Sequence, residues 1–151
     1  MIWTPHATVA TIVENDGKFL LVEERSNNAD VINQPAGHVE KGESIIDAAI
    51  RETLEETGWL VSPEYLVGIY TYTAPYNDIT YYRFCFAAST VKFLEDSPID
   101  SDIQGQCWLT IDEINQKQAM HRGPLVALCI KDYLDGKQFP LSLIYEHPEG
   151  K

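Results

Sequence analysis

The chain has 151 residues, 44% of them hydrophobic and 23% charged, a composition typical of a globular protein, and its length predicts one domain over residues 1–151. Its 11 Lys and Arg against 23 Asp and Glu give a formal net charge of −12, which excludes the basic surface that binding to bulk nucleic acid requires. An anionic small molecule remains compatible with this charge, because bound divalent cations can invert the local field of an acidic site.

Two apolar runs rich in β-branched residues, 7–13 and 18–24, open the chain and flank Asn15-Asp16-Gly17. Asp-Gly between two such runs is a strong hairpin signal, so a β-hairpin is predicted here. The runs 66–73 and 80–89 and the short run around Trp108 predict further strands, which complete a mixed sheet.

A first helix is predicted from Ser44 to Gly58. Ser44 and Asp47 form a start that resembles a capping box, and Gly58 is a typical stop. At about 100° per residue, the helix has an apolar face and a separate carboxylate face. The apolar face carries Ile46, Ala49, Ile50, Thr53, Leu54 and Thr57, and the carboxylate face carries Glu52, Glu55 and Glu56.

A second helix is predicted from Pro124 to about Leu134, with Gly136 ending it. Its expected buried face carries Leu125, Leu128, Cys129 and Tyr133. Thr110 and Glu113 read as the capping box of a further short helix. The order of strands, helix, strands and helix predicts an α+β sandwich in which a mixed β-sheet lies between helices.

The carboxylate face of the first helix is expected to bind a cation, because glutamates three and four residues apart on a helix repel each other. The alternative interpretation is a solvated acidic face. The preceding polar loop, residues 33–37, ends in Gly37, which lets the backbone come close to a ligand. A loop carbonyl together with helix carboxylates is typical of a site for a hard cation.

The same segment resembles the signature of the Nudix hydrolases, G-x5-E-x7-R-E-U-x-E-E-x-G-U. The match covers every charged and glycine position, and Thr53 and Trp59 depart from it only at apolar positions. The matching residues are Gly37, Glu43, Arg51, Glu52, Glu55, Glu56 and Gly58. The resemblance implies the Nudix α/β/α sandwich and hydrolysis of a nucleoside diphosphate linked to another moiety, or of related diphosphates, with Mg²⁺ or Mn²⁺.

Within that family, the chain is similar to the NudJ-type bacterial phosphatases through PHATVA, NQPAGHVE, RGPLV and YLDGKQFPLSLI. This similarity implies release of phosphate from thiamine pyrophosphate, hydroxymethylpyrimidine pyrophosphate or nucleoside tri- and diphosphates. Two alternatives stay open. The first alternative is an ADP-ribose or oxidised-nucleotide pyrophosphatase, because Pro75, sixteen residues after Trp59, resembles a marker of ADP-ribose-type Nudix enzymes. The second alternative is a non-catalytic Nudix-fold binding module, which the intact carboxylate set disfavours.

The resemblance also suggests roles for individual residues. Glu52, Glu55, Glu56 and the Gly37 carbonyl are predicted to bind the metal, with Arg51 pairing with Glu43 or orienting a carboxylate ligand. The general base is Glu52 or Glu55 in the helix, or Asp100 or Asp102 in the acidic loop 94–105, and we include Asp102 among the catalytic candidates. The expected partner is a phosphorylated small molecule, and the expected assembly is a monomer or a homodimer.

The remaining features carry weaker predictions. Tyrosines alternate on the two strands after the helix, and core or cross-strand packing is favoured over a platform that stacks on a pyrimidine. The tyrosines are Tyr70, Tyr72, Tyr76, Tyr81 and Tyr82, and Arg83 follows the last of them. Three widely spaced cysteines predict core thiols without disulfides or zinc. The N-terminus lacks a signal-peptide pattern and no run is long enough to span a bilayer, so we expect a cytoplasmic protein without a membrane partner.

Overall fold

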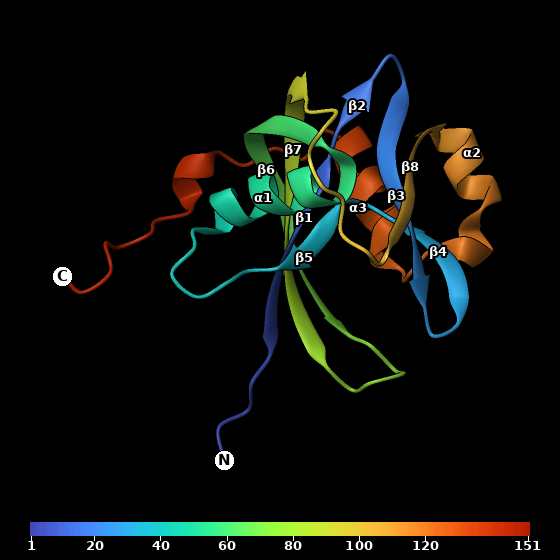
Figure 1. The fold of residues 1–151 in the computed structure, drawn as a ribbon. Coiled ribbons are helices and arrows are strands. Elements are labelled where there is room, and N and C mark those ends of the chain that lie inside the picture. The colour runs from blue at the N-terminus through green and yellow to red at the C-terminus, as the bar shows by residue number, and fades with distance from the viewer.

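The computed structural model describes residues 1–151 and contains two four-stranded β-sheets with helices packed against them (Figure 1). The elements, in chain order, are β1 His6–Ile12, β2 Glu14–Asn15, β3 Lys18–Ser26, β4 Ala29–Asn33, β5 Ala36–His38, α1 Ile45–Thr57, β6 Trp59–Thr73, β7 Thr80–Phe93, β8 Ile103–Thr110, α2 Ile111–Gln116, the 3-10 helix Gln118–Met120, α3 Leu125–Leu134 and the 3-10 helix Leu141–Leu143. No helix is both long enough and apolar enough to cross a membrane.

The first sheet is mixed and has the strand order β5-β1-β7-β6. Strands β1 and β7 run parallel, whereas β5 and β6 pair antiparallel with their neighbours. Strands β6 and β7 form a long hairpin, and its turn end projects downward beside the N-terminal segment in Figure 1. The second sheet is antiparallel and contains β2, β3, β4 and β8, with β8 paired to β3.

The hairpin predicted near the N-terminus is only partly correct. Asp16 and Gly17 do form the turn, with the positive φ angles of 52° and 77° that an Asp-Gly turn requires. The hairpin involves only the short β2 and the start of β3, whereas the run 7–13 forms most of β1, which pairs with β5 and β7. The physical reason is burial: residues 9–13 are all buried, as in a strand covered on both faces.

Helix α1 begins and ends where the sequence predicts. The Ser44 side chain accepts a hydrogen bond from the Asp47 N–H, and Gly58 ends the helix with a φ of 78°. The predicted apolar face is only partly right, since Ile46, Ile50 and Leu54 are half-buried. The buried residues are Ala48, Ala49, Thr53, Glu56 and Thr57, and their mostly small side chains let the helix lie close to the strands.

Helix α3 is confirmed with nearly the predicted bounds, but Leu128 on its predicted buried face is exposed. The short helix after Thr110 is also confirmed as α2, and it has both hydrogen bonds of the capping box. The buried face of α3 includes Leu125 and Cys129, as predicted, together with Val126, Ile130 and Asp132.

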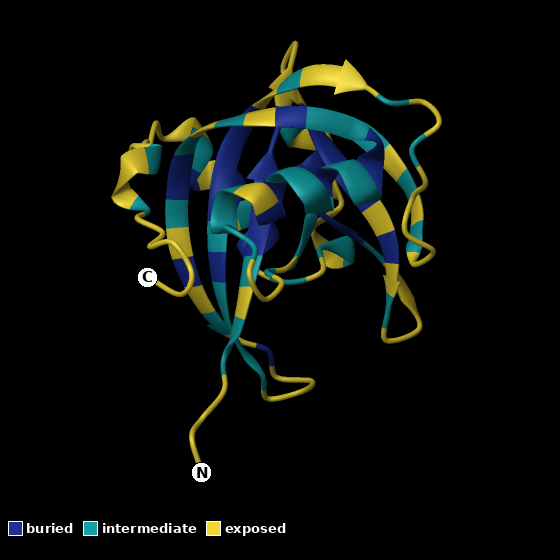
Figure 2. Cartoon of the chain, turned by 60° about the vertical axis from the view of Figure 1, so that its left-hand side comes forward, coloured by how far each residue is buried: buried dark blue, intermediate teal, exposed yellow.

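Helices α1 and α3 lie on opposite faces of the mixed sheet. Val9, Leu66 and Phe86 pack with the alanines of α1, whereas the strand neighbours Ala10, Val67 and Cys85 pack with α3 and the second sheet. Because successive side chains on a strand point to opposite faces, this alternation places a helix on each side. The α+β class with a mixed sheet between helices is therefore confirmed, although the strands form two sheets rather than one. Buried residues follow the central strands in Figure 2, and the chain ends are exposed.

Candidate active site

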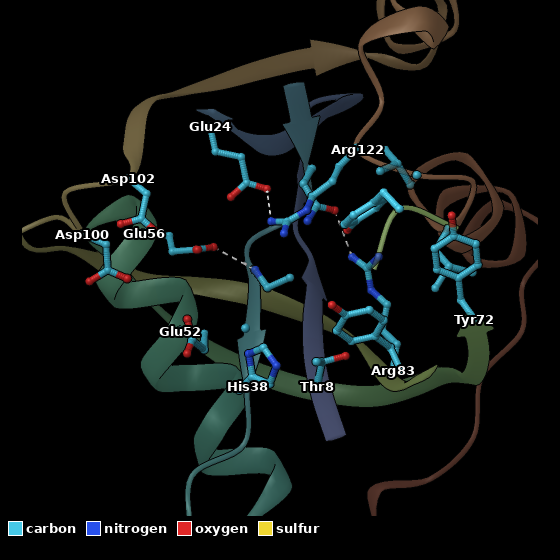
Figure 3. Close-up of a pocket in the computed structure, with 18 of the residues that line it drawn as sticks. Thr8, Glu24, His38, Glu52, Glu56, Tyr72, Arg83, Asp100, Asp102 and Arg122 are labelled. Atoms are coloured by element: carbon cyan, nitrogen blue, oxygen red, sulfur yellow. Dashed lines mark hydrogen bonds and ion pairs between the residues drawn. The ribbon is translucent and has the colours of Figure 1, made fainter. Parts of the chain in front are cut away.

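A pocket of about 450 Å³ opens where α1, β5, the loop before β8 and the turn end of the β6–β7 hairpin meet. Carboxylates line one side and an arginine and tyrosines line the other (Figure 3). The lining residues are Thr8, Glu24, Asn33, Ala36, Gly37, His38, Glu40, Glu52, Glu56, Tyr72, Tyr76, Tyr81, Arg83, Asp100, Asp102, Arg122, Gly123, Leu125 and Val126.

Arg51 binds several groups beside the pocket at once. Its Nε donates to Oε2 of Glu43 over 2.6 Å, as the predicted pairing requires. Its Nη1 donates to Glu52 over 2.9 Å and to Glu55 over 3.1 Å, and its Nη2 donates to the backbone carbonyl of His38. The hydrogen bond from Arg51 lowers the pKa of Glu43 below its ordinary value. Arg51 thus fixes the carboxylates of α1 relative to the end of β5.

Three carboxylates converge at the pocket. Glu52, Glu55 and Asp100 each offer an oxygen, and these oxygens lie within 4.8 Å of one another. The Asp100 backbone N–H donates to the Glu55 carbonyl over 2.9 Å, which ties the loop before β8 to α1. We call these residues the three-carboxylate cluster. A donor set made only of oxygens suits a hard divalent cation.

Gly37 and Glu52 are in close contact. A Cβ atom on Gly37 would overlap the carboxyl group of Glu52, so a larger residue here would force that carboxyl group to move. The contact follows from the pairing of β5 with β1, in which Gly37 lies opposite Val9. The glycine therefore brings the β5 backbone against one of the predicted metal ligands.

Glu56 is 7% exposed, and its Oε1 accepts a hydrogen bond from the Ala36 N–H over 2.8 Å. Burial raises the pKa of Glu56 to about 9. Burial also raises the pKa of Glu52 to about 7, and the hydrogen bond from Arg51 only partly opposes this. Buried carboxylates of this kind are costly to ionise without a nearby cation. The residues present therefore fit a divalent metal ion.

The structure brings most of the predicted site residues together. Gly37, Glu52 and Glu56 line the pocket, and Glu55 joins Glu52 in the three-carboxylate cluster. Asp102 lines the pocket too, but Asp100 rather than Asp102 belongs to that cluster. The metal-binding and catalytic roles of these residues, including Arg51, stay predictions.

Some of the strand tyrosines pack against other side chains of the protein, and others line the pocket. Tyr70 is a core residue whose hydroxyl donates to Asp132 over 2.8 Å, and Tyr82 packs edge-on against Trp3. Tyr72, Tyr76 and Tyr81 line the pocket instead. The three cysteines are free, as predicted, with two buried and Cys107 half-buried.

Sequence reasoning missed Glu24 and Arg122, which form a 2.7 Å ion pair in the pocket wall. Glu24 is 7% exposed and follows Val22 at the spacing of one strand face. A charged residue at a core-facing position was thus a signal in the sequence. Arg122 lies in the loop before α3, where strand spacing gives no such signal, and the sequence marks it only as the first residue of the RGPLV segment that resembles NudJ-type phosphatases.

Comparison with known proteins gives concordant results. A NUDIX domain model matches residues 4–129. Phosphatase NudJ of Escherichia coli is 40% identical over 143 residues, which are 95% of this chain and 92% of that protein. The structure of a NUDIX hydrolase from Nitrosomonas europaea superposes with a TM-score of 0.94 at 50% identity, covering 98% of this chain and all of that one. The NUDIX domain of Shewanella oneidensis NrtR, solved with ADP ribose, shares the fold with a TM-score of 0.70 at 13% identity, over 89% of each chain.

Proposed function

This chain belongs to the Nudix family and is a NudJ-like phosphohydrolase of phosphoanhydrides, and from that premise we propose that it releases phosphate from thiamine pyrophosphate, hydroxymethylpyrimidine pyrophosphate or nucleoside tri- and diphosphates. One observation carries the proposal: a converging set of carboxylates borders a pocket large enough for a phosphorylated small molecule. Nudix hydrolases generally use divalent metal ions. We infer that this one uses Mg²⁺, with Mn²⁺ able to substitute.

Glu52, Glu55 and Glu56 would hold the metal, with Asp100 and the Gly37 carbonyl as further oxygen ligands. The metal ion would neutralise charge on the phosphoryl group and make a bound water more acidic. The three-carboxylate cluster and the buried Glu56 support this assignment, because the cluster brings three carboxylate oxygens close together and burial raises the pKa of Glu56 to about 9.

Arg51 serves as a positioning residue. It contacts Glu43, Glu52, Glu55 and the His38 carbonyl, so it holds the carboxylates in place and does not line the pocket itself. The base that accepts a proton from the attacking water is drawn from Glu52 and Glu55 on α1 or from Asp100 and Asp102 on the loop before β8. All four lie in or beside the pocket.

A panel of phosphoanhydrides, with product analysis by phosphorus NMR in the presence of Mg²⁺, tests the proposal. We expect orthophosphate from thiamine pyrophosphate or from nucleoside tri- and diphosphates. Production of AMP and ribose phosphate from ADP-ribose, without orthophosphate from the other compounds, would instead assign an ADP-ribose pyrophosphatase. Binding without turnover would assign a non-catalytic module.

Two variants give the panel an internal control. Glu52→Gln removes a carboxylate of the three-carboxylate cluster and should abolish turnover on every substrate. Glu113→Gln makes the same chemical change in the exposed capping box of α2, where glutamine also caps, and should leave turnover intact.

A further inference from the structure

Arg83 differs from the other three arginines of the chain. Arg25, Arg51 and Arg122 each pair with at least one carboxylate, and their side chains are 58%, 23% and 42% exposed. Arg83 is 8% exposed and forms no ion pair. A chain with a net charge of −12 therefore leaves its one buried arginine without a carboxylate partner.

The existing contacts of Arg83 use only one end of its guanidinium group. Its Nη2 donates to the amide oxygens of Gln34 over 2.8 Å and Asn33 over 3.2 Å. Gln34 is held in turn, because its own amide nitrogen donates to the Val126 carbonyl over 2.8 Å. The Nε of Arg83 is buried and has no hydrogen-bond partner. The guanidinium is thus fixed in orientation while a donor remains free.

A second donor of Arg83, Nη1, also makes no hydrogen bond and is not fully buried, so a ligand in the pocket can reach it. Arg83 lies on β7, opposite Thr8 on β1, and both residues line the pocket. Figure 3 shows Arg83 and Tyr72 across the pocket from Glu52, Glu56, Asp100 and Asp102. A substrate that reaches the carboxylates with one phosphoryl group can therefore present other groups to Arg83.

A buried cation is costly unless an anion pairs with it, and neutral amide oxygens compensate only in part. Arginine also binds phosphate strongly, because its N–H donors match the phosphate oxygens. We propose that Arg83 is the anion receptor of this pocket and binds a phosphoryl oxygen of the substrate's phosphate chain, with Gln34 and Asn33 holding it in place. This inference rests on the proposed function, since it takes the substrate to be a di- or triphosphate.

The first test measures the binding of methylenediphosphonate, a diphosphate analogue that cannot be hydrolysed, by calorimetry in the presence of Mg²⁺. Arg83→Gln should weaken binding on the order of tenfold to a hundredfold, because it removes a charged donor. Arg25→Gln removes an exposed, carboxylate-paired arginine and should bind like the wild type. Thiamine without phosphate serves as a second probe, and its affinity should not depend on Arg83.

The second test neutralises Arg83 without removing it. Asn33→Asp keeps the shape of the side chain and places a carboxylate where an amide oxygen now accepts from Arg83. The variant should keep or raise the melting temperature but lose affinity for methylenediphosphonate. A purely structural Arg83 would leave that affinity unchanged. Asn115→Asp, an exposed site on α2, controls for the added charge.

A double-mutant cycle separates pairing from general repulsion. If Asn33→Asp acts through Arg83, the combined variant should bind about as weakly as Arg83→Gln alone. Additive losses would mean that the new charge repels the ligand directly, and they would overturn the mechanism.

The inference and the proposed function can fail separately. Unchanged diphosphonate affinity in folded Arg83→Gln or in Asn33→Asp overturns the anion receptor, even if the wild type hydrolyses the panel. Loss of thiamine affinity alone, or a wild type that does not bind the diphosphonate, also overturns it. If the wild type hydrolyses no phosphoanhydride but the variants lose diphosphonate affinity, the receptor stands and the proposed function fails.

Discussion

Replacing Glu56 with glutamine tests the link between buried charge and metal binding. Glutamine preserves size and helix propensity and keeps an oxygen that can accept from the Ala36 N–H, but it cannot ionise. Burial raises the pKa of Glu56 to about 9 from an ordinary value of 4.5. The folded wild type therefore holds a proton that the unfolded chain releases above pH 4.5.

The sign of the pH dependence follows from that difference. Wild-type stability in the absence of metal should be highest below the unfolded pKa and fall as the pH rises through about 9. The whole change amounts to at most about 6 kcal/mol, since one pKa unit corresponds to 1.36 kcal/mol. Glu56→Gln removes this loss, so the metal-free variant should match the wild type near pH 5 and exceed its stability at pH 9.

Catalysis should change in the opposite direction. A metal ion supplies several kcal/mol of transition-state stabilisation, and each 1.36 kcal/mol is a factor of ten in rate. We expect kcat of Glu56→Gln to fall on the order of 10³, with partial rescue at higher Mg²⁺ or Mn²⁺. Denaturant titrations in EDTA at pH 5, 7 and 9, together with kcat across a metal titration, measure both effects. A folded variant with wild-type turnover at low metal would refute the reasoning.

Two further pairs of substitutions test the geometry of the site. Asp100→Asn and Asp102→Asn identify the base: the variant at the base should lose kcat, and Asp100→Asn should also weaken Mg²⁺ binding because Asp100 belongs to the three-carboxylate cluster. Near-wild-type turnover in both would return the role to α1. Gly37→Ala should lower kcat about tenfold or more, because its Cβ would displace the Glu52 carboxyl, whereas Gly105→Ala, which has open space around the added Cβ, should be neutral. Equal turnover in the two alanine variants would contradict the close approach at Gly37.

Local chemistry explains what the sequence could predict. The bounds of α1 follow from the Ser44 cap and the αL stop at Gly58, and both lie next to the helix in the chain. The Arg51–Glu43 pair and the converging carboxylates follow from a motif whose spacing is fixed. The turn at Asp16-Gly17 was also predictable, because it depends on two residues.

Long-range pairing explains what the sequence could not predict. The partners of β1 are β5 and β7, and no pattern within β1 specifies them. The helical pattern placed Glu56 on the same face as Glu52 and Glu55. It could not predict that Glu56 is buried, because this burial depends on the contact with Ala36 on β5. Arg83 was grouped with the strand tyrosines, and only the fold brings it to Gln34 and Asn33 without a carboxylate partner.

The central claim is that a divalent metal held by these carboxylates drives phosphoanhydride hydrolysis. The most direct measurement is the initial rate of orthophosphate release from the best panel substrate, as free Mg²⁺ is titrated from an EDTA-treated baseline. We predict no turnover in EDTA, saturable recovery with Mg²⁺ or Mn²⁺, and loss of that recovery in Glu52→Gln. Full turnover in EDTA, or a Glu52→Gln variant with the wild-type metal response, would contradict the account.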